Sequence, residues 1–557
     1  MKKLVTSLYL GIAFFIAPHA YAAPAALSPS TSAPVAGQAV QPRTASNALA
    51  QTVLSVPASP VIADVNAGQQ TAPTALTQPA PAVSSSAPPQ IAPASSVAAP
   101  ATSPAVPQAA PAVQGQLASP TAASPAPAAT ATATVAAPAT KAAADAVVVS
   151  STYTGTIINA KDKRPLANVR ITLGNQVVYT NPQGAFTITG QGSKLGVFAS
   201  GYARQQFVLS QQKPPSTIAL SRFIVKGLYL TDYGLANSKL RNGVLDVVKR
   251  NHMNALVIDV KDDHGLIYFK LNAPLTAQVG AESKILIKDM PGMVADLKSR
   301  GLYLIARVAV FKDNVLATTK PEWAAQKNGK PYVDRQKMRW TDPFVPQVQQ
   351  YNIGIAKAAA AVGFDEIQLD YVRFPDAKGV VFSKPVDSAS RTQAITTFLQ
   401  AMHQALIPYN VTLSADIFGY VLWNENDTGI GQQVGKIADA VDIISPMLYP
   451  SGFQWGIPNY LNPIKHPYEI VYFTLKHGQA RTDVSSLHFR PWLQAFNDYA
   501  FHGGVFTEDR MRQQIQAAED FGAEGYLFWN PRNVYPTGIF TNTHVKTQSD
   551  LESKKAQ

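Results

Sequence analysis

The sequence predicts an α/β protein built as a (β/α)8 TIM barrel, preceded by a small β-sandwich and a long disordered tether. Three observations support this. Strand-like and helix-like segments alternate from residue 223 onward, and short strands separated by turn residues fill 147–222. Residues 23–146 consist mainly of Ala, Pro, Ser, Thr, Gln and Val. Because regular alternation of strands and helices is typical of a parallel sheet covered by helices, we expect the barrel to span 223–540.

The first residues, 1–22, have the pattern of a secretory signal peptide. A basic start is followed by an apolar segment, 4–17, and Ala20-Tyr21-Ala22 is a small-x-small cleavage site. We therefore expect export to the periplasm or the extracellular space, including association with the cell envelope. No later apolar run is long enough for a transmembrane helix. The sequence has no cysteine, which excludes disulfides, thiolate metal sites and lipid-modified cysteine anchors.

The chain is basic, with a formal net charge of +12 and a sequence pI of about 9.4. Such a charge can indicate nucleic-acid binding. The predicted export and the lack of a Lys/Arg stripe argue against a nucleic-acid partner. Attraction to anionic polymers of the cell envelope is the interpretation we favour.

The segment 23–146 predicts a disordered tether. Between residues 23 and 140 the charged residues are only Arg43 and Asp64, and proline is frequent. Proline interrupts helices and central strands, and small side chains bury too little apolar area to offset chain entropy. The last residues, 541–557, are also expected to be disordered.

Residues 147–222 predict a small β-sandwich, because short strands recur between turn signals at 159–165, 181–184 and 190–193. The expected strands are 153–158, 169–173, 177–180, 186–189, 194–199 and 205–209.

Three motifs in this region resemble the carboxypeptidase regulatory-like family. They are GTI (155–157), PLANV (165–169) and TNPQGAF (180–186). The resemblance covers about 150–221 and implies a transthyretin-like accessory domain without a catalytic role. We expect it to act as a spacer or in adhesion.

Eight strands and their intervening helices are expected in the barrel. An open doubly wound sheet is the alternative, but no glycine-rich phosphate loop follows the first strand. The expected strands are 225–231, 254–260, 302–310, 364–371, 410–417, 440–447, 488–494 and 524–529. The expected helices include 239–250, 288–300, 347–361, 390–406 and 509–521.

The segment 364–375, which ends the fourth strand, is the most informative part of the chain. Its apolar residues share one face, while Gln368 and Asp370 share the other. In a barrel such a polar face points inward and reaches the end where chemistry is done. Arg373 follows three residues after Asp370. The structural alternative is that Asp370 pairs with Arg373 to hold a loop.

The second and third strands bring further charges to the same end. Asp259 and Lys261 share a face and should point into the barrel, with Asp262 directly after them. A turn role is the alternative for Asp262. The third strand holds Arg307 among apolar residues, and a buried arginine needs a carboxylate partner. Asp259 or Asp370 could supply it.

The fifth strand places Thr412, Ser414 and Asp416 on one face. Because neighbouring parallel strands are ~4.8 Å apart, Asp416 should stand beside Asp370. Two carboxylates ~5–9.5 Å apart are typical of a hydrolase that cleaves sugars with a carboxylate pair.

The last three strands end in aromatic and amide side chains: Tyr449, Gln494, Trp529 and Asn530. Flat apolar rings suit sugar rings, and amides suit sugar hydroxyls. Each aromatic alone could belong to the core, but their shared position at strand ends favours a sugar site.

Residues 223 to about 540 resemble a glycoside hydrolase family catalogued as a domain of unknown function (DUF4015), within the α-galactosidase-like barrel superfamily. The matching segments are VIDVKDD (257–263), Arg307 with FKD (311–313), WTDP (340–343), QLDYVRFP (368–375), SPMLYPS (445–451), RPWLQ (490–494) and FWN (528–530).

In the related enzymes the strand-four aspartate is the nucleophile, which implies Asp370 here. Their acid tends to come from strand six, where this chain has Tyr449, so Asp416 is the expected acid and Asp262 the alternative. Chitinase-like barrels end strand four with Asp-x-Asp-x-Glu, but here the glutamate position holds Val372. A chitinase mechanism is therefore rejected.

Two hypotheses follow. The first is an exported glycoside hydrolase that cleaves a polysaccharide with Asp370 and Asp416, and the second is a carbohydrate-binding protein on an enzyme-like barrel. A carboxyl with an apolar environment and a raised pKa would favour the hydrolase. We expect a monomer with no cofactor and no metal. The expected substrate-binding residues are Asp259, Lys261, Asp262, Arg307, Lys312, Gln368, Arg373, Tyr449, Gln494, Trp529 and Asn530.

Overall fold

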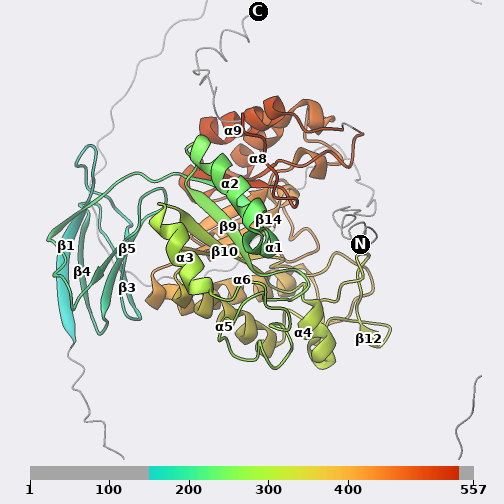
Figure 1. Cartoon of the computed structure of the whole chain (residues 1–557), viewed down its shortest axis with the longest axis horizontal. Helices are drawn as coiled ribbons and strands as arrows, with labels where there is room; N and C mark the ends of the chain where they lie inside the picture. Colours follow the sequence, from blue (N-terminus) through green and yellow to red (C-terminus); the bar gives the residue numbers. More distant parts are fainter. Residues whose placement is uncertain (1–149, 503, 539–557) are drawn as a thin grey trace, which may run out of the picture. The chain divides into compact units, whose positions relative to one another are not determined.

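The structure is a computed structural model that describes residues 150–502 and 504–538 (Figure 1). The expected signal peptide (1–22), tether (23–146) and C-terminal tail (541–557) lie outside the described residues and stay predictions. No helix within the described ranges has the length and apolar character needed to cross a membrane.

Two small sheets precede the barrel, and their buried side chains form one apolar cluster that includes Ile157, Ile171, Ile188 and Val197. Strand order is β4-β1-β7 in one sheet and β3-β2-β5-β6 in the other. Two sheets around one core form the predicted sandwich, with β7 as an additional short strand that pairs parallel to β1. The strands are β1 (Ser151–Asn159), β2 (Arg170–Leu173), β3 (Gln176–Tyr179), β4 (Ala185–Gly190), β5 (Lys194–Phe198), β6 (Gln205–Val208) and β7 (Thr217–Leu220).

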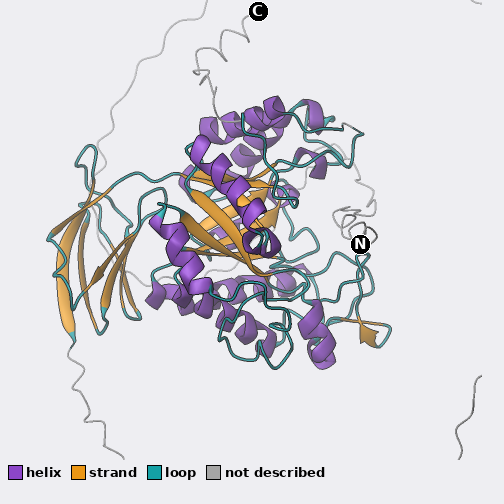
Figure 2. Cartoon of the chain, viewed as in Figure 1, coloured by secondary structure: helices purple, strands orange, loops and turns teal. Residues whose placement is uncertain are grey.

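The larger part is a closed barrel of eight parallel strands surrounded by helices (Figure 2). Strand β17 pairs with β8, which closes the sheet and rules out the open alternative. The predicted (β/α)8 barrel is thus confirmed. Its strands are β8 (Val225–Leu230), β9 (Ala255–Lys261), β10 (Tyr303–Ala309), β13 (Glu366–Asp370), β14 (Thr412–Phe418), β15 (Ile443–Met447), β16 (Trp492–Gln494) and β17 (Gly525–Trp529).

Helices begin and end where local chemistry favours it. Asp387 caps one helix by accepting from the backbone N–H of Ser390 at 2.7 Å, and Ser390 Oγ accepts from the N–H of Asp387 at 2.9 Å. Gly363 ends another helix with a φ of 116°. The helices are α1 (Asp232–Ala236), α2 (Ser238–Arg250), α3 (Met290–Ser299), α4 (Asn314–Thr319), α5 (Pro346–Val362), α6 (Ser388–Leu406), α7 (Val434–Ala438), α8 (Pro467–Gln479) and α9 (Glu508–Phe521). A short hairpin, β11 (Gln326–Lys327) and β12 (Lys330–Pro331), lies between α4 and α5 in the chain.

Successive residues of the barrel strands pack alternately into two separate hydrophobic clusters. Leu228 and Ile258 pack in the large cluster that includes the helices. Tyr229, Val257 and Trp492 form a separate cluster, which places them inside the barrel. This period of two brings the polar residues of β9, β10, β13 and β14 into the interior.

Lys261 lies on the opposite face from the one predicted. Asp259 pairs with Arg307 across the β9–β10 ladder, but the register then shifts so that Lys261 pairs with Val308. This irregularity breaks the alternation of the strand. The Nζ of Lys261 donates to Asn352 Oδ1 of α5 at 2.8 Å. Lys261 is therefore buried between the barrel wall and a helix, and it does not share the inward face with Asp259.

Buried ion pairs occupy the N-terminal end of the barrel. Arg490 Nη1 donates to both carboxylate oxygens of Glu366 at 2.8 Å, and its Nε donates to Glu524 at 2.5 Å. Burial raises the pKa of Glu524 to about 7, against the effect of Arg490.

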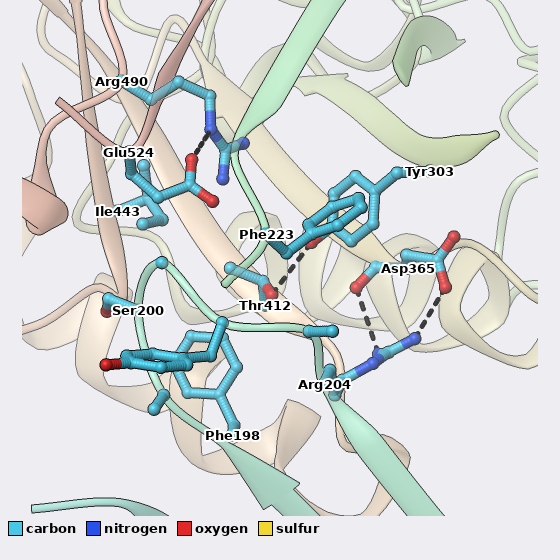
Figure 3. A pocket seen from close by; sticks show the side chains of 14 residues that line it. Phe198, Ser200, Arg204, Phe223, Tyr303, Asp365, Thr412, Ile443, Arg490 and Glu524 are labelled. Carbon is cyan, nitrogen blue, oxygen red and sulfur yellow. Dashed lines mark hydrogen bonds and ion pairs between the residues drawn. The ribbon is translucent and has the colours of Figure 1, made fainter. Parts of the chain in front are cut away.

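A cavity of about 200 Å³ lies at the same end, between residues of the sandwich and of the barrel (Figure 3). Arg204 reaches from the sandwich to Asp365 at 2.7 Å, while Arg490 holds Glu524 (Figure 3). The cavity is lined by the beginnings of strands, whereas the polar motifs identified in the sequence lie at their carboxyl ends.

Candidate active site

Four charged residues meet inside the barrel near the carboxyl ends of neighbouring strands. They are Asp259 on β9, Arg307 on β10, Asp370 on β13 and Asp416 on β14, and each is at most 9% exposed. The ladders place Arg307 opposite Asp259, and Asp370 opposite Ala309. The cluster contains three carboxylates and one guanidinium, so the carboxylates cannot all be neutralised by it.

Arg307 binds two of the carboxylates at once. Its Nη1 donates to Asp259 Oδ1 at 2.6 Å, and its Nη2 and Nε donate to Asp370 Oδ2 at 2.5 and 3.1 Å. Tyr229 Oη donates to the second oxygen of Asp259. Burial raises the pKa of Asp259, and Arg307 counteracts that rise. The buried arginine thus has the carboxylate partners that its position in an apolar strand requires.

Asp370 is oriented through both of its oxygens. Oδ2 faces Arg307, and Oδ1 accepts from the backbone N–H of Tyr371 at 2.6 Å. Tyr371 has a φ of 49°, in the left-handed region, which turns the chain directly after the strand. Two hydrogen bonds to Oδ2 and one to Oδ1 thus fix the orientation of the carboxyl group.

Arg373 lies among aromatic rings. Its guanidinium carbon is 4.7 Å from the ring centre of Trp340 and 4.6 Å from that of Phe418, and Nη1 donates to the carbonyl of Phe374 at 3.0 Å. Burial lowers the pKa of Arg373. Arg307, on the neighbouring strand, is the arginine that forms the ion pair with Asp370.

Asp416 is held in a different way. Its Oδ1 accepts from Trp492 Nε1 at 2.8 Å, and only 2% of the residue is exposed. Burial, and next the negative charge of Asp370, raise the pKa of Asp416 well above its ordinary value. Leu369 and Ala415 pair across β13 and β14, so Asp370 and Asp416 are the next residues on adjacent strands. The two carboxyl groups therefore lie in different surroundings, Asp370 beside the Arg307 guanidinium and Asp416 beside the neutral indole of Trp492.

Asp262 and Lys312 are engaged in loops above the strands. Asp262 Oδ1 accepts from the N–H groups of His264 at 3.0 Å and Leu266 at 2.8 Å, as the turn alternative predicts. Its other oxygen accepts from Tyr268 Oη at 2.9 Å. Burial raises the pKa of Asp262 to about 6. Lys312 pairs with Asp263, with Nζ and Oδ2 2.9 Å apart.

Three predicted sugar ligands use their amide groups inside the protein. Gln368, which is fully buried, donates to Ser445 Oγ at 3.1 Å. Gln494 donates to Ser451 Oγ at 2.8 Å. Asn530 donates to the carbonyl of Ala495 at 2.7 Å. In these contacts the amides join strands and loops of the barrel.

Aromatic rings surround the carboxylates. Trp529 stacks on Tyr229 with ring centres 3.8 Å apart and an interplanar angle of 16°. The guanidinium carbon of Arg307 lies 4.9 Å from the ring centre of Trp529. Burial raises the pKa of Tyr449 well above its ordinary value, and the charges of Asp416 and Asp370 add to the rise. Aromatic rings and charged side chains thus lie together at the end of the barrel where the strands have their carboxyl ends, here called the mouth.

Asp232, the first residue of α1, is a buried carboxylate that was not predicted from the sequence. Burial, followed by the charges of Asp259 and Asp262, raises its pKa to about 8. Thr231 caps α1 by accepting from the N–H of Gly234 at 2.9 Å. A Thr-Asp pair directly after the first barrel strand is a signal of a helix start, and it could have identified this carboxylate. Within the described part of the chain, no group of three or more histidine, aspartate and glutamate side chains could hold a metal ion.

Three solved structures are similar to part of this chain. A hypothetical protein from Ruminiclostridium thermocellum is 35% identical, with 34% of this chain and 96% of that chain covered and a TM-score of 0.30. The PgaB (BpsB) glycoside hydrolase domain from Bordetella bronchiseptica is 16% identical, with 56% and 95% covered and a TM-score of 0.42. The alpha-L-fucosidase isoenzyme 2 from Paenibacillus thiaminolyticus is 14% identical, with 60% and 50% covered and a TM-score of 0.40.

None of the curated proteins compared with the chain matches it. A family model described as "Putative glycosyl hydrolase domain" matches residues 227–535, which span the barrel from its first strand to its last. The chain therefore belongs to this glycosyl hydrolase family, DUF4015.

Proposed function

We propose that the protein is an exported glycoside hydrolase that cleaves a glycosidic bond of a polysaccharide, with Asp370 as nucleophile or base and Asp416 as general acid. The observation that supports this most strongly is the contrast between the two neighbouring carboxyls. Arg307 and the Tyr371 N–H donate hydrogen bonds to Asp370. Burial and the charge of Asp370 favour the protonated form of Asp416. Glycoside hydrolysis requires one carboxyl group that donates a proton and a second that acts as nucleophile or base.

In the proposed reaction Asp416 gives its proton to the glycosidic oxygen, and the bond from that oxygen to the anomeric carbon breaks. Asp370 either attacks the anomeric carbon, or removes a proton from the water that does so. If Asp370 attacks, water then hydrolyses the glycosyl ester and returns a proton to Asp416. Asp259 and Arg307 keep Asp370 in place, and the rings of Trp529 and Tyr449 are suited to the apolar face of a sugar.

The alternative is a protein that binds carbohydrate without cleaving it. That function would be favoured if every carboxylate in the mouth were fixed in an ion pair. Asp259 and Asp370 are both paired with Arg307, whereas the hydrogen bond to Asp416 comes from the neutral indole of Trp492. Asp416 therefore remains available as a proton donor, which supports hydrolysis.

A screen of the purified protein against bacterial exopolysaccharides and peptidoglycan glycans tests the proposal, with new reducing ends as the readout. Appearance of reducing ends supports hydrolysis, and binding without cleavage would favour the alternative. Export is part of the proposal because it rests on the signal-peptide pattern. N-terminal sequencing of the exported protein tests it, since cleavage after Ala22 would leave Ala23 first.

Replacing Asp416 with asparagine should impair cleavage of natural glycans more than cleavage of aryl glycosides with good leaving groups. A good leaving group needs little protonation, whereas general acid catalysis is typically worth 10²–10⁴-fold on a poor one. The measurement is kcat/KM on both substrate types for the parent and Asp416→Asn. Asp262→Asn is the matched comparison, because Asp262 is the alternative acid. Equal losses on both substrates for Asp416→Asn would remove Asp416 from the acid role.

A further inference from the structure

Aromatic side chains continue outward from the carboxylates along the loop that follows β16. The ring of Tyr449 meets that of Phe496 edge-on, with ring centres 5.3 Å apart at 75°. Phe496 in turn stacks on Tyr499, with ring centres 6.0 Å apart at 12°. Tyr499 is 36% exposed. The row therefore leads from a ring influenced by the charges of Asp416 and Asp370 to a ring at the protein surface.

Hydrogen bonds to Asp498 tie down the loop that carries Tyr499. Asp498 Oδ1 accepts from Ser451 Oγ at 2.7 Å and from the N–H of Ala500 at 3.1 Å, and Oδ2 accepts from the N–H of Phe501 at 2.9 Å. Ser451 belongs to the loop after β15, so the loops after β15 and β16 are tied together. A ring on such a loop is oriented before any ligand arrives, which lowers the entropic cost of binding.

A second exposed ring, Trp455, stands on the loop after β15. Tyr420 Oη accepts from the N–H of Trp455 at 3.0 Å and donates to the carbonyl of Gly456 at 3.0 Å. The rings of Tyr420 and Trp455 are 5.6 Å apart. Gly456 has a φ of 66°, and a Cβ there would lie 2.3 Å from the carbonyl oxygen of Tyr460. The backbone around Trp455 is thus fixed, while 52% of the residue is exposed.

Exposed aromatic residues on fixed backbone have a chemistry that suits a sugar polymer. Their flat apolar faces match the C–H faces of pyranose rings, and they lose little side-chain entropy on binding. Single exposed apolar residues are common on protein surfaces. Here, however, the row around Tyr499 is continuous with Tyr449 in the candidate site, and Trp455 lies six residues beyond Tyr449 in the same loop region.

We propose that Tyr499 and Trp455 bind further units of a polysaccharide chain whose pyranose rings present flat apolar faces, so that the enzyme acts on long chains. The part of this inference that concerns cleavage of long chains rests on the proposed function. Binding can be measured without cleavage, so the two can fail separately. The ligand at both rings is the glycan chain itself, continuing from the bond held at Asp370 and Asp416.

The test is affinity electrophoresis of the full chain in gels that contain hydroxyethyl cellulose or glycol chitin, in an Asp370→Asn background that prevents turnover. Trp455→Ala and Tyr499→Ala should each weaken binding to a retarding polymer at least about tenfold, the scale on which aromatic anchors contribute. Trp455→Phe and Tyr499→Phe should keep most of the binding, because they keep a flat ring. Tyr179→Ala is the matched control, since Tyr179 lies on β3 of the sandwich and is 59% exposed.

Each outcome decides the proposal. Loss in both alanine variants, with recovery in the phenylalanine variants and no change in Tyr179→Ala, supports it. Unchanged retardation of Trp455→Ala and Tyr499→Ala would overturn it, and so would a background protein that neither polymer retards. Self-association that the alanine variants abolish without any change in retardation would assign the rings to a protein contact instead. If retardation depends on the two rings but the parent protein cleaves no glycan, the proposed hydrolase function is contradicted, whereas glycan binding by Tyr499 and Trp455 is not.

Discussion

Replacing Asp370 with asparagine is expected to lower kcat/KM on the cleaved polysaccharide by at least about 10²–10⁴-fold, the range that one positioned acid or base contributes. The amide keeps the shape of the side chain but has neither the charge nor the nucleophilicity of the carboxylate. Arg307 keeps Asp259 as a partner at 2.6 Å, so the variant should stay folded. Reducing-end assays and thermal unfolding on the same preparation separate the two effects.

Asp365→Asn is the matched control for that experiment. Asp365 is also a buried aspartate next to β13, but it lies before the strand and pairs with Arg204 at 2.7 Å and Lys298 at 2.8 Å. Its loss should reduce stability and leave turnover of the folded protein near that of the parent. Full activity of Asp370→Asn would refute the hydrolase mechanism built on β13.

Replacing Arg490 with methionine should destabilise the protein by about 3–5 kcal/mol, the cost of leaving a buried charge without its partner. Arg490 is 1% exposed and is shared by Glu366 and Glu524. Methionine is long enough to fill the space but cannot neutralise either carboxylate. Equilibrium unfolding in urea measures the change in free energy of unfolding.

Two further variants make the prediction about Arg490 specific. Arg300→Met removes an exposed pair with Asp296 and should change stability by less than about 1 kcal/mol. Adding Glu366→Gln and Glu524→Gln to Arg490→Met should recover part of the loss, because the amides carry no charge. A loss for Arg490→Met as small as that for Arg300→Met would contradict the role of Arg490 as a buried partner of two carboxylates.

The alternation of polar and apolar residues was enough to predict much of the candidate site. It placed Asp370 and Asp416 on adjacent strands and predicted that Arg307 would need Asp259 or Asp370, and the structure shows Arg307 with both. These predictions succeed because side-chain direction in a strand has a period of two, and because a buried charge requires a partner.

The same period failed where the ladder is irregular. The register shift in the β9–β10 pairing places Lys261 on the outer face of the barrel. No residue type in that segment predicts the register shift. Partners that come from distant loops were equally inaccessible to sequence reasoning. The bond from Trp492 to Asp416 and the use of Gln494 and Asn530 inside the protein depend on how separate strand ends meet in space.

The most direct test of the central claim is the pH dependence of kcat/KM for the parent and Asp416→Asn on the cleaved polysaccharide, whose poor leaving group needs a proton. Asp416 must be protonated to act as the acid, and its pKa is raised by burial and by the charge of Asp370. Activity of the parent should therefore fall as the pH rises through that pKa. The account predicts that this alkaline limb disappears in Asp416→Asn. The same alkaline limb in both proteins would contradict it.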